Sequence, residues 1–117
     1  MAASIVAAID RSPAALQAAR LLADYRGDRA ALSVVLVNVQ PAGTRDADLR
    51  RDGAAELDPA RELLAAAGLA VETRVHLGEP STRVIEEAAQ RKAAAIVAGT
   101  RGRGVLGGFA LGSVSLP

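Results

Sequence analysis

The chain has 117 residues, enough for one domain with a single core and too few for two, so residues 1–117 are expected to form one domain. It contains no cysteine and one histidine, which excludes disulfides, thiol catalysis, thiolate metal sites and clusters of histidine ligands. A net charge of +1 indicates neither a nucleic acid nor a membrane as partner, and with no visible signal peptide or membrane-spanning apolar stretch we expect a cytoplasmic protein.

The first part of the chain predicts a strand, a helix and a second strand. Residues 4–9 (SIVAAI) are continuously apolar, as expected of a strand that is covered on both faces. Ser12 and Pro13 then have the residue types of a helix N-cap and a first helical position. Residues 32–39 (LSVVLVNV) are rich in β-branched side chains and form the strongest predicted strand.

The middle of the chain carries weaker signals. Residues 40–57 combine charge and glycine with little periodicity, so we predict a loop. Asp58 and Pro59 repeat the pattern of a cap followed by proline, and a helix is expected to begin there and to end near Gly68.

The last part predicts two more strands separated by a helix. Residues 70–77 alternate as in a strand, residues 78–80 (GEP) begin a helix, and residues 94–98 (AAIVA) form a short buried strand. This alternation of strands and helices predicts an α/β fold with a parallel sheet, helices on both faces and right-handed crossovers.

The third predicted helix has an amphipathic pattern. The side chains expected to face the core are apolar: Val84, Ile85, Ala88 and Ala89. Those expected on the opposite face are charged: Arg83, Glu87 and Arg91.

A glycine-rich segment follows the last predicted strand. It reads Gly99-Thr100-Arg101-Gly102, then nine further residues, then Gly112-Ser113. Glycine lets the backbone turn sharply and bring its N–H groups close to an anion, and a strand followed by such a loop holds phosphate in many α/β folds. The alternative is a flexible tail with solvated arginines. The segment is not a P-loop, because the required Gly-Lys-Ser/Thr ending is missing. The dinucleotide fingerprint is also excluded, since no Gly-x-Gly-x-x-Gly follows the first predicted strand.

Asp10 directly follows the first predicted strand. In open parallel sheets, ligands bind beyond the carboxyl ends of strands where the strand order reverses. If the first and fourth strands are neighbours, Asp10 and the glycine segment face one crevice, and Asp10 would bind a sugar hydroxyl or a phosphate-bound metal. The alternative is a carboxylate that only orders the turn before Ser12.

The sequence favours binding over catalysis. No nucleophile with an adjacent base can be assembled from these residue types. His76, at the end of a predicted strand, is interpreted as a structural or surface histidine rather than a catalytic base.

The pattern Gly-x2-Gly-x9-Gly-Ser resembles the nucleotide-binding signature of the universal stress protein family. Residues 5–13 (IVAAIDRSP) are similar to the first strand and turn of that family. Residues 37–39 lie where its second strand ends, and residues 78–80 where a Gly-x-Pro turn precedes its third helix. The resemblance therefore spans the chain.

This resemblance implies a flavodoxin-like sheet in the order 3-2-1-4-5 and a bound adenine nucleotide such as ATP, with or without magnesium. No residue is expected to bind a metal directly. The implied contacts are the ribose at Asp10, the adenine at the backbone of Val39, and the phosphates at Gly99, Arg101, Gly102, Gly112, Ser113 and Ser115.

Family members continue beyond Gly-Ser-x-Ser into a last helix and a fifth strand, which commonly forms the dimer contact, whereas this sequence ends at Pro117. We therefore expect the order 3-2-1-4 without the fifth strand, and a homodimer that covers the edge of the fourth strand. The expected function is an adenine-nucleotide-binding regulatory module of the stress response. The alternatives are a member that does not bind nucleotide and acts as an interaction module, and a slow ATP hydrolase.

Overall fold

The computed structural model describes residues 3–98. Its elements, in chain order, are β1 (Ala3–Ala8), α1 (Pro13–Ala23), η1 (Arg29–Ala31), β2 (Leu32–Gln40), α2 (Asp46–Ala66), β3 (Ala70–Leu77), α3 (Pro80–Arg91) and β4 (Ala95–Ala98). None of the helices in this range is long and apolar enough to cross a membrane.

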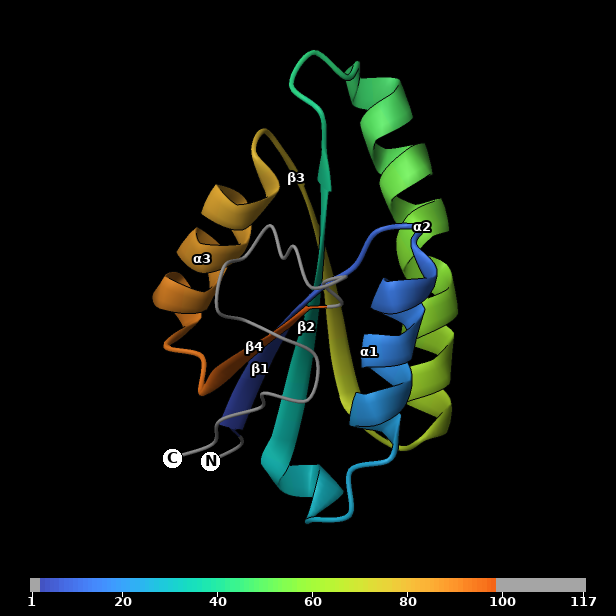
Figure 1. Ribbon diagram of the computed structural model, residues 1–117, viewed down its shortest axis with the longest axis vertical. Helices are drawn as coiled ribbons and strands as arrows, with labels where there is room; N and C mark the ends of the chain where they lie inside the picture. The colour runs from blue at the N-terminus through green and yellow to red at the C-terminus, as the bar shows by residue number, and fades with distance from the viewer. Residues whose placement is uncertain (1–2, 99–117) are drawn as a thin grey trace.

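The four strands form one parallel sheet in the order β3-β2-β1-β4. Helices α1 and α2 cover one face of the sheet and α3 covers the other (Figure 1). The predicted α/β class and the order 3-2-1-4 are thus confirmed for the described residues. The expectation about a fifth strand concerns the chain beyond residue 98, which lies outside them.

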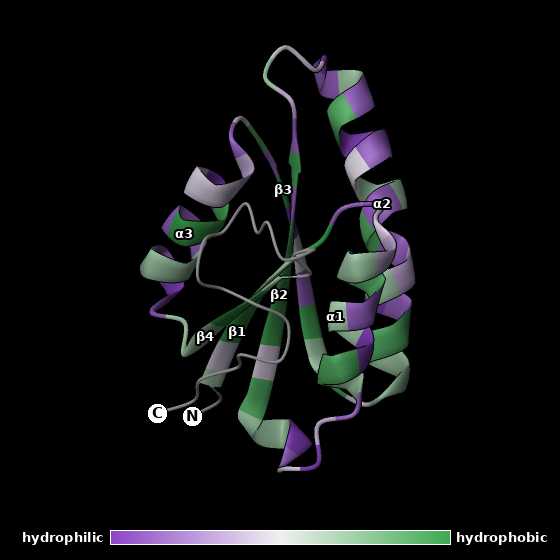
Figure 2. Ribbon diagram, in the orientation of Figure 1, coloured by the Kyte–Doolittle hydropathy of each residue, from purple (hydrophilic) through white to green (hydrophobic). Residues whose placement is uncertain are grey.

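The sheet separates two hydrophobic layers, because successive side chains of a strand point to opposite faces. On the side of α1 and α2, Ile5, Val34 and Leu36 belong to the larger buried cluster. On the side of α3, Val6 and Val35 pack in a smaller one that includes Val84. The strands at the centre of the sheet are largely green in Figure 2, as expected for strands buried on both faces.

The start of α1 follows the prediction closely. Ser12 is the N-cap, and its hydroxyl accepts a hydrogen bond of 3.2 Å from the backbone N–H of Ala15. Pro13 occupies the first helical position, where its missing N–H costs nothing. The loop before the helix is thereby held in place, and this loop carries Asp10.

The predicted loop over residues 40–57 is wrong over most of its length, and so is the predicted helix start at Asp58. Helix α2 begins at Asp46 and runs through Pro59 to Ala66. Pro59 removes one backbone hydrogen bond, but a helix tolerates this when packing stabilises both halves. That packing comes from inward-facing residues three or four apart: Gly53, Leu57, Ala60 and Leu64. Several of the charged side chains that indicated a loop are exposed on this helix, whereas Glu56 is turned toward β2.

Candidate functional site

The candidate site lies at the carboxyl edge of the sheet. Strands β1 and β4 are hydrogen-bonded neighbours, and Ala8, the last residue of β1, pairs with Ala98, the last residue of β4. Asp10 follows β1 by two residues, and Gly99 is the next residue of the sequence after β4. The condition set for a shared crevice, that the first and fourth strands be neighbours, is therefore met.

Asp10 orders the turn that leads into α1. Its Oδ1 accepts a hydrogen bond of 2.8 Å from the backbone N–H of Ser12, and the residue is exposed. A carboxylate has about four acceptor positions, so this bond leaves others free for a ligand hydroxyl. The structural role of Asp10 and its proposed binding role are compatible.

A cavity of about 570 Å³ lies beside Asp10, between the β1–α1 loop and α2. This volume is within the range of ligand pockets. Its lining is mostly apolar and comprises Ile9, Asp10, Arg11, Ser12, Pro13, Leu16, Asp52, Ala55, Glu56, Pro59 and Ala60. Apolar walls with a few polar groups suit a flat organic ring carrying polar substituents.

A polar cluster lies next to this cavity and shares Ile9 and Glu56 with its lining. Asn38 is fully buried, and its side-chain amide donates to the carbonyl of Ile9 and to Glu56 Oε1, both at 2.9 Å. The amide of Gln40 donates to Asn38 Oδ1 at 2.7 Å and to Glu56 Oε2 at 3.3 Å. The cluster joins β2, the β1–α1 loop and α2. Within residues 3–98, no buried side-chain N or O atom lacks a hydrogen-bond partner.

Arg11 completes this cluster from the solvent side. Its Nη2 lies 3.1 Å from Glu56 Oε2, and the side chain of Arg11 is 83% exposed while that of Glu56 is 13% exposed. The ion pair connects the β1–α1 loop to α2 beside the cavity.

Val39 lies near the end of β2, between Asn38 and Gln40 at the same edge of the sheet. It is half-buried and pairs with His76 of β3. This position is consistent with a backbone contact to a ligand at the carboxyl edge, which stays a prediction. The predicted phosphate contacts lie outside the described residues: Gly99, Arg101, Gly102, Gly112, Ser113 and Ser115.

Sequence reasoning missed Arg11, Asn38 and Glu56. Asn38 had a signal, because it is an amide within the otherwise largely apolar run of residues 32–39. Glu56 had none, since it falls in the segment that was predicted to be a loop.

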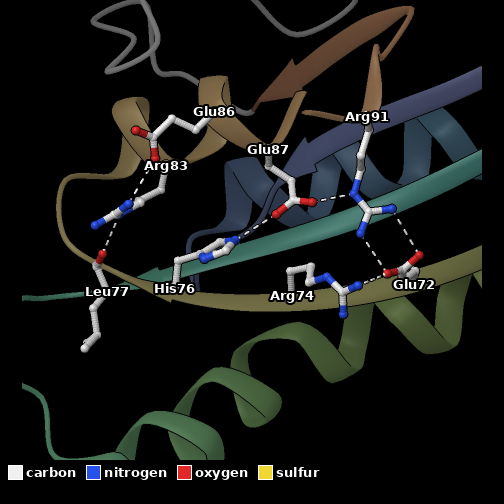
Figure 3. Close-up of polar contacts among 8 residues, drawn as sticks. All are labelled: Glu72, Arg74, His76, Leu77, Arg83, Glu86, Glu87 and Arg91. Carbon is white, nitrogen blue, oxygen red and sulfur yellow. Dashed lines mark hydrogen bonds and ion pairs between the residues drawn. The ribbon is translucent and has the colours of Figure 1, made fainter. Parts of the chain in front are cut away.

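A second charged network lies on the other side of the sheet, between β3 and α3 (Figure 3). His76 Nε2 is 2.8 Å from Glu87 Oε1, and Arg91 donates to both Glu87 and Glu72. Glu87 was expected on the exposed face of its helix, but it is buried, whereas Ile85, expected in the core, is 47% exposed. The predicted amphipathic pattern of this helix is therefore wrong at Glu87 and Ile85.

The charges of this network stabilise each other. Burial raises the pKa of Glu87, but the hydrogen bonds from Arg91 and His76 outweigh it and hold the pKa below its ordinary value. The hydrogen bond from Arg91 likewise lowers the pKa of Glu72, and the two carboxylates raise that of Arg91. His76 therefore has a structural partner and lies away from the cavity beside Asp10.

Solved structures with a similar fold include universal stress proteins, among them two that were determined with an adenine nucleotide bound. A universal stress protein family protein from Arabidopsis thaliana with AMP bound is 19% identical, with a TM-score of 0.74 and coverage of 98% of this chain and 87% of that chain. The universal stress protein from Archaeoglobus fulgidus in complex with dAMP is 24% identical (TM-score 0.67, coverage 84% and 80%). A family protein from Burkholderia pseudomallei is 27% identical (TM-score 0.65, coverage 86% and 83%).

Two sequence comparisons complete this picture. A search of the curated proteins finds no match. The model of the universal stress protein family matches residues 1–116, which is nearly the whole chain. Together with the parallel sheet and the turn at Asp10, this match shows that the chain belongs to the universal stress protein family.

Proposed function

We propose that this protein is an adenine-nucleotide-binding regulatory module of the stress response. One observation carries the proposal: Asp10 lies at the carboxyl edge of neighbouring strands β1 and β4, next to a cavity of about 570 Å³. Structurally similar members of the family were solved with AMP and with dAMP, which supports an adenine nucleotide as the ligand.

Within this proposal, the carboxylate of Asp10 accepts a hydrogen bond from the ribose and the backbone of Val39 contacts the adenine. The glycine segment after residue 98 contacts the phosphates, as the family resemblance implies. ATP, with or without magnesium, is the proposed physiological ligand, and the proposed acting form is a homodimer. The role is one of binding and does not include a chemical step.

Purified protein provides the first test. The chain has one tyrosine and no tryptophan, so a co-purified adenine nucleotide would dominate its ultraviolet absorbance. Calorimetric titration with AMP and with ATP, each with and without magnesium, should show saturable binding. An ultraviolet spectrum of protein alone, together with no heat and no thermal shift from any of these nucleotides, would contradict the proposal.

Variants at Asp10 then test the site. Asp10→Ala should weaken nucleotide binding about tenfold or more, because it removes a charged hydrogen-bond acceptor. Asp10→Asn keeps a side-chain oxygen that can accept from the Ser12 N–H but removes the negative charge. Its affinity therefore shows the effect of the charge without loss of the turn. Asp24→Ala is the matched control, since Asp24 is an exposed aspartate at the far end of α1. Equal affinities for the Asp10 and Asp24 variants would place the ligand elsewhere.

A further inference from the structure

Arg11 is the one cation among the described residues that line the cavity beside Asp10. Three carboxylates line the same cavity: Asp10, Asp52 and Glu56. A nucleotide phosphate that approaches Asp10 meets this negative charge, and repulsion between like charges weakens binding. Arg11 is adjacent to Asp10 in the chain, so its long side chain is well placed to compensate.

The contact that holds Arg11 is easily exchanged. Arg11 reaches Glu56 through the Nη2 atom, at 3.1 Å, and most of its side chain is in solvent. Ion pairs with an exposed partner contribute little to stability, because water screens them and a flexible side chain must be ordered. A phosphate offers the guanidinium a stronger, two-pronged contact.

Glu56 does not depend on Arg11 for its hydrogen bonds. Its Oε1 accepts from Asn38 and its Oε2 from Gln40, at 2.9 and 3.3 Å. Both donors belong to residues that are at least nine-tenths buried, so they stay in place when Arg11 moves. Release of Arg11 therefore leaves no buried carboxylate without a donor.

We propose that Arg11 is a phosphate-binding residue of this site and that Glu56 holds it beside the cavity until a nucleotide arrives. This inference rests on the proposed nucleotide-binding function and adds to it a phosphate-binding residue and a preference for phosphorylated ligands. The cavity would then select phosphorylated nucleosides over neutral ones through one exchangeable arginine.

The test compares AMP with adenosine, which differ by the phosphate. Calorimetric titration of Arg11→Gln should show an affinity for AMP about tenfold weaker than that of the wild type, because a charge-assisted hydrogen bond is lost, and an unchanged affinity for adenosine. The affinity of Arg11→Lys for AMP should fall between those of the wild type and Arg11→Gln, because lysine keeps the positive charge but lacks the paired N–H donors of the guanidinium. Arg61→Gln, which breaks the ion pair of Arg61 with Asp58 elsewhere on α2, should match the wild type with both ligands.

Two further measurements separate the parts of the proposal. The affinity of the wild type for AMP should fall more steeply with salt than that of Arg11→Gln. Glu56→Gln no longer holds Arg11 but also loses one of the two acceptors for Asn38 and Gln40, so its readout is the ratio of the AMP affinity to the adenosine affinity. This ratio should rise above that of the wild type, and an equal or lower ratio would overturn the holding role.

The outcomes distinguish this inference from the proposed function. Suppose that the wild type binds AMP and that Arg11→Gln weakens the affinities for AMP and adenosine equally, or weakens neither. The inference is then overturned and the proposed function stands. If the wild type binds neither ligand, both are overturned.

Discussion

The side-chain amide of Asn38 donates a hydrogen bond of 2.9 Å to the carbonyl oxygen of Ile9, which joins the end of β2 to the loop that carries Asp10. The same amide donates to Glu56 of α2. Asn38 is fully buried, so its bond to Ile9 forms away from water. Asn38 thus helps to hold the loop in position at the candidate site.

Asn38→Ala should lower the free energy of unfolding by about 1–3 kcal/mol, because the carbonyl of Ile9 and the amide of Gln40 lose buried partners. Urea denaturation measures this loss. Gln17→Ala, on the exposed face of α1, should leave the stability unchanged. The Asn38 variant should also bind nucleotide more weakly, since Asp10 is then less well positioned. A variant with native stability would show that water replaces the amide without cost.

Gly53→Ala should destabilise the protein, although alanine favours helix. A Cβ atom at Gly53 would lie 2.6 Å from both Cγ atoms of Val75 on β3, closer than packed atoms allow. Overpacking costs about 1–3 kcal/mol, more than the gain of up to about 1 kcal/mol from helix propensity. Thermal and urea unfolding measure the net loss.

The double variant Gly53→Ala with Val75→Ala provides the control for this prediction. Removing the two methyl groups of Val75 opens the space that the new Cβ needs, so the two changes should be strongly non-additive. Additive losses would show that the close approach of α2 to β3 does not explain the glycine.

Glu79 makes the start of α3 sensitive to acid. As the N-cap it accepts hydrogen bonds from the Ser81 hydroxyl and from the backbone N–H groups of Thr82 and Ser81, and these lower its pKa to about 2. A pKa that is lower in the folded state stabilises the protein above the ordinary value near 4.5, and this contribution disappears as the pH falls toward 2. We expect wild-type stability to decrease over that window.

The difference in the free energy of unfolding between the wild type and Glu79→Gln isolates the contribution of Glu79, because the other carboxylates titrate in both proteins. In urea unfolding the two stabilities should converge as the pH is lowered from 6 toward 2. Ser81→Ala removes the first of the lowering contacts and should shrink the pH-dependent difference. A constant difference at all pH values would show that the charge of Glu79 is unimportant for the cap.

Glu87→Ala should destabilise the protein by about 1–3 kcal/mol at neutral pH, because it leaves His76 and Arg91 without their buried partner. The adjacent Glu86→Ala removes an exposed carboxylate and should have little effect. Since the pKa of Glu87 is lowered in the folded state, the Glu87 contribution should be lost as the pH falls below the ordinary value. Equal stabilities of the two variants would contradict the structural role of this network.

Local residue types were enough to predict much of the fold. The apolar runs of β1 and β2 and the cap followed by proline at Ser12 and Pro13 act through neighbouring residues, so they can be read without knowledge of the partners. The spacing of the glycine segment indicated the family, and the strand order followed from that resemblance. The matching family model and the β3-β2-β1-β4 sheet confirm both.

The sequence by itself thus determined the strands, the class of fold and the turn that carries Asp10. Only the tertiary structure decided that α2 continues through Pro59, because Leu57 and Leu64 pack against the sheet on either side of the proline. It also decided which charges are buried. Glu87 is buried beside Arg91 and His76, which lie within hydrogen-bond distance. Glu56 is largely shielded from solvent where Asn38 and Gln40 reach it from β2. His76, Asn38 and Gln40 are distant in sequence from the carboxylates they contact, so the place of these charges emerges only when the chain has folded.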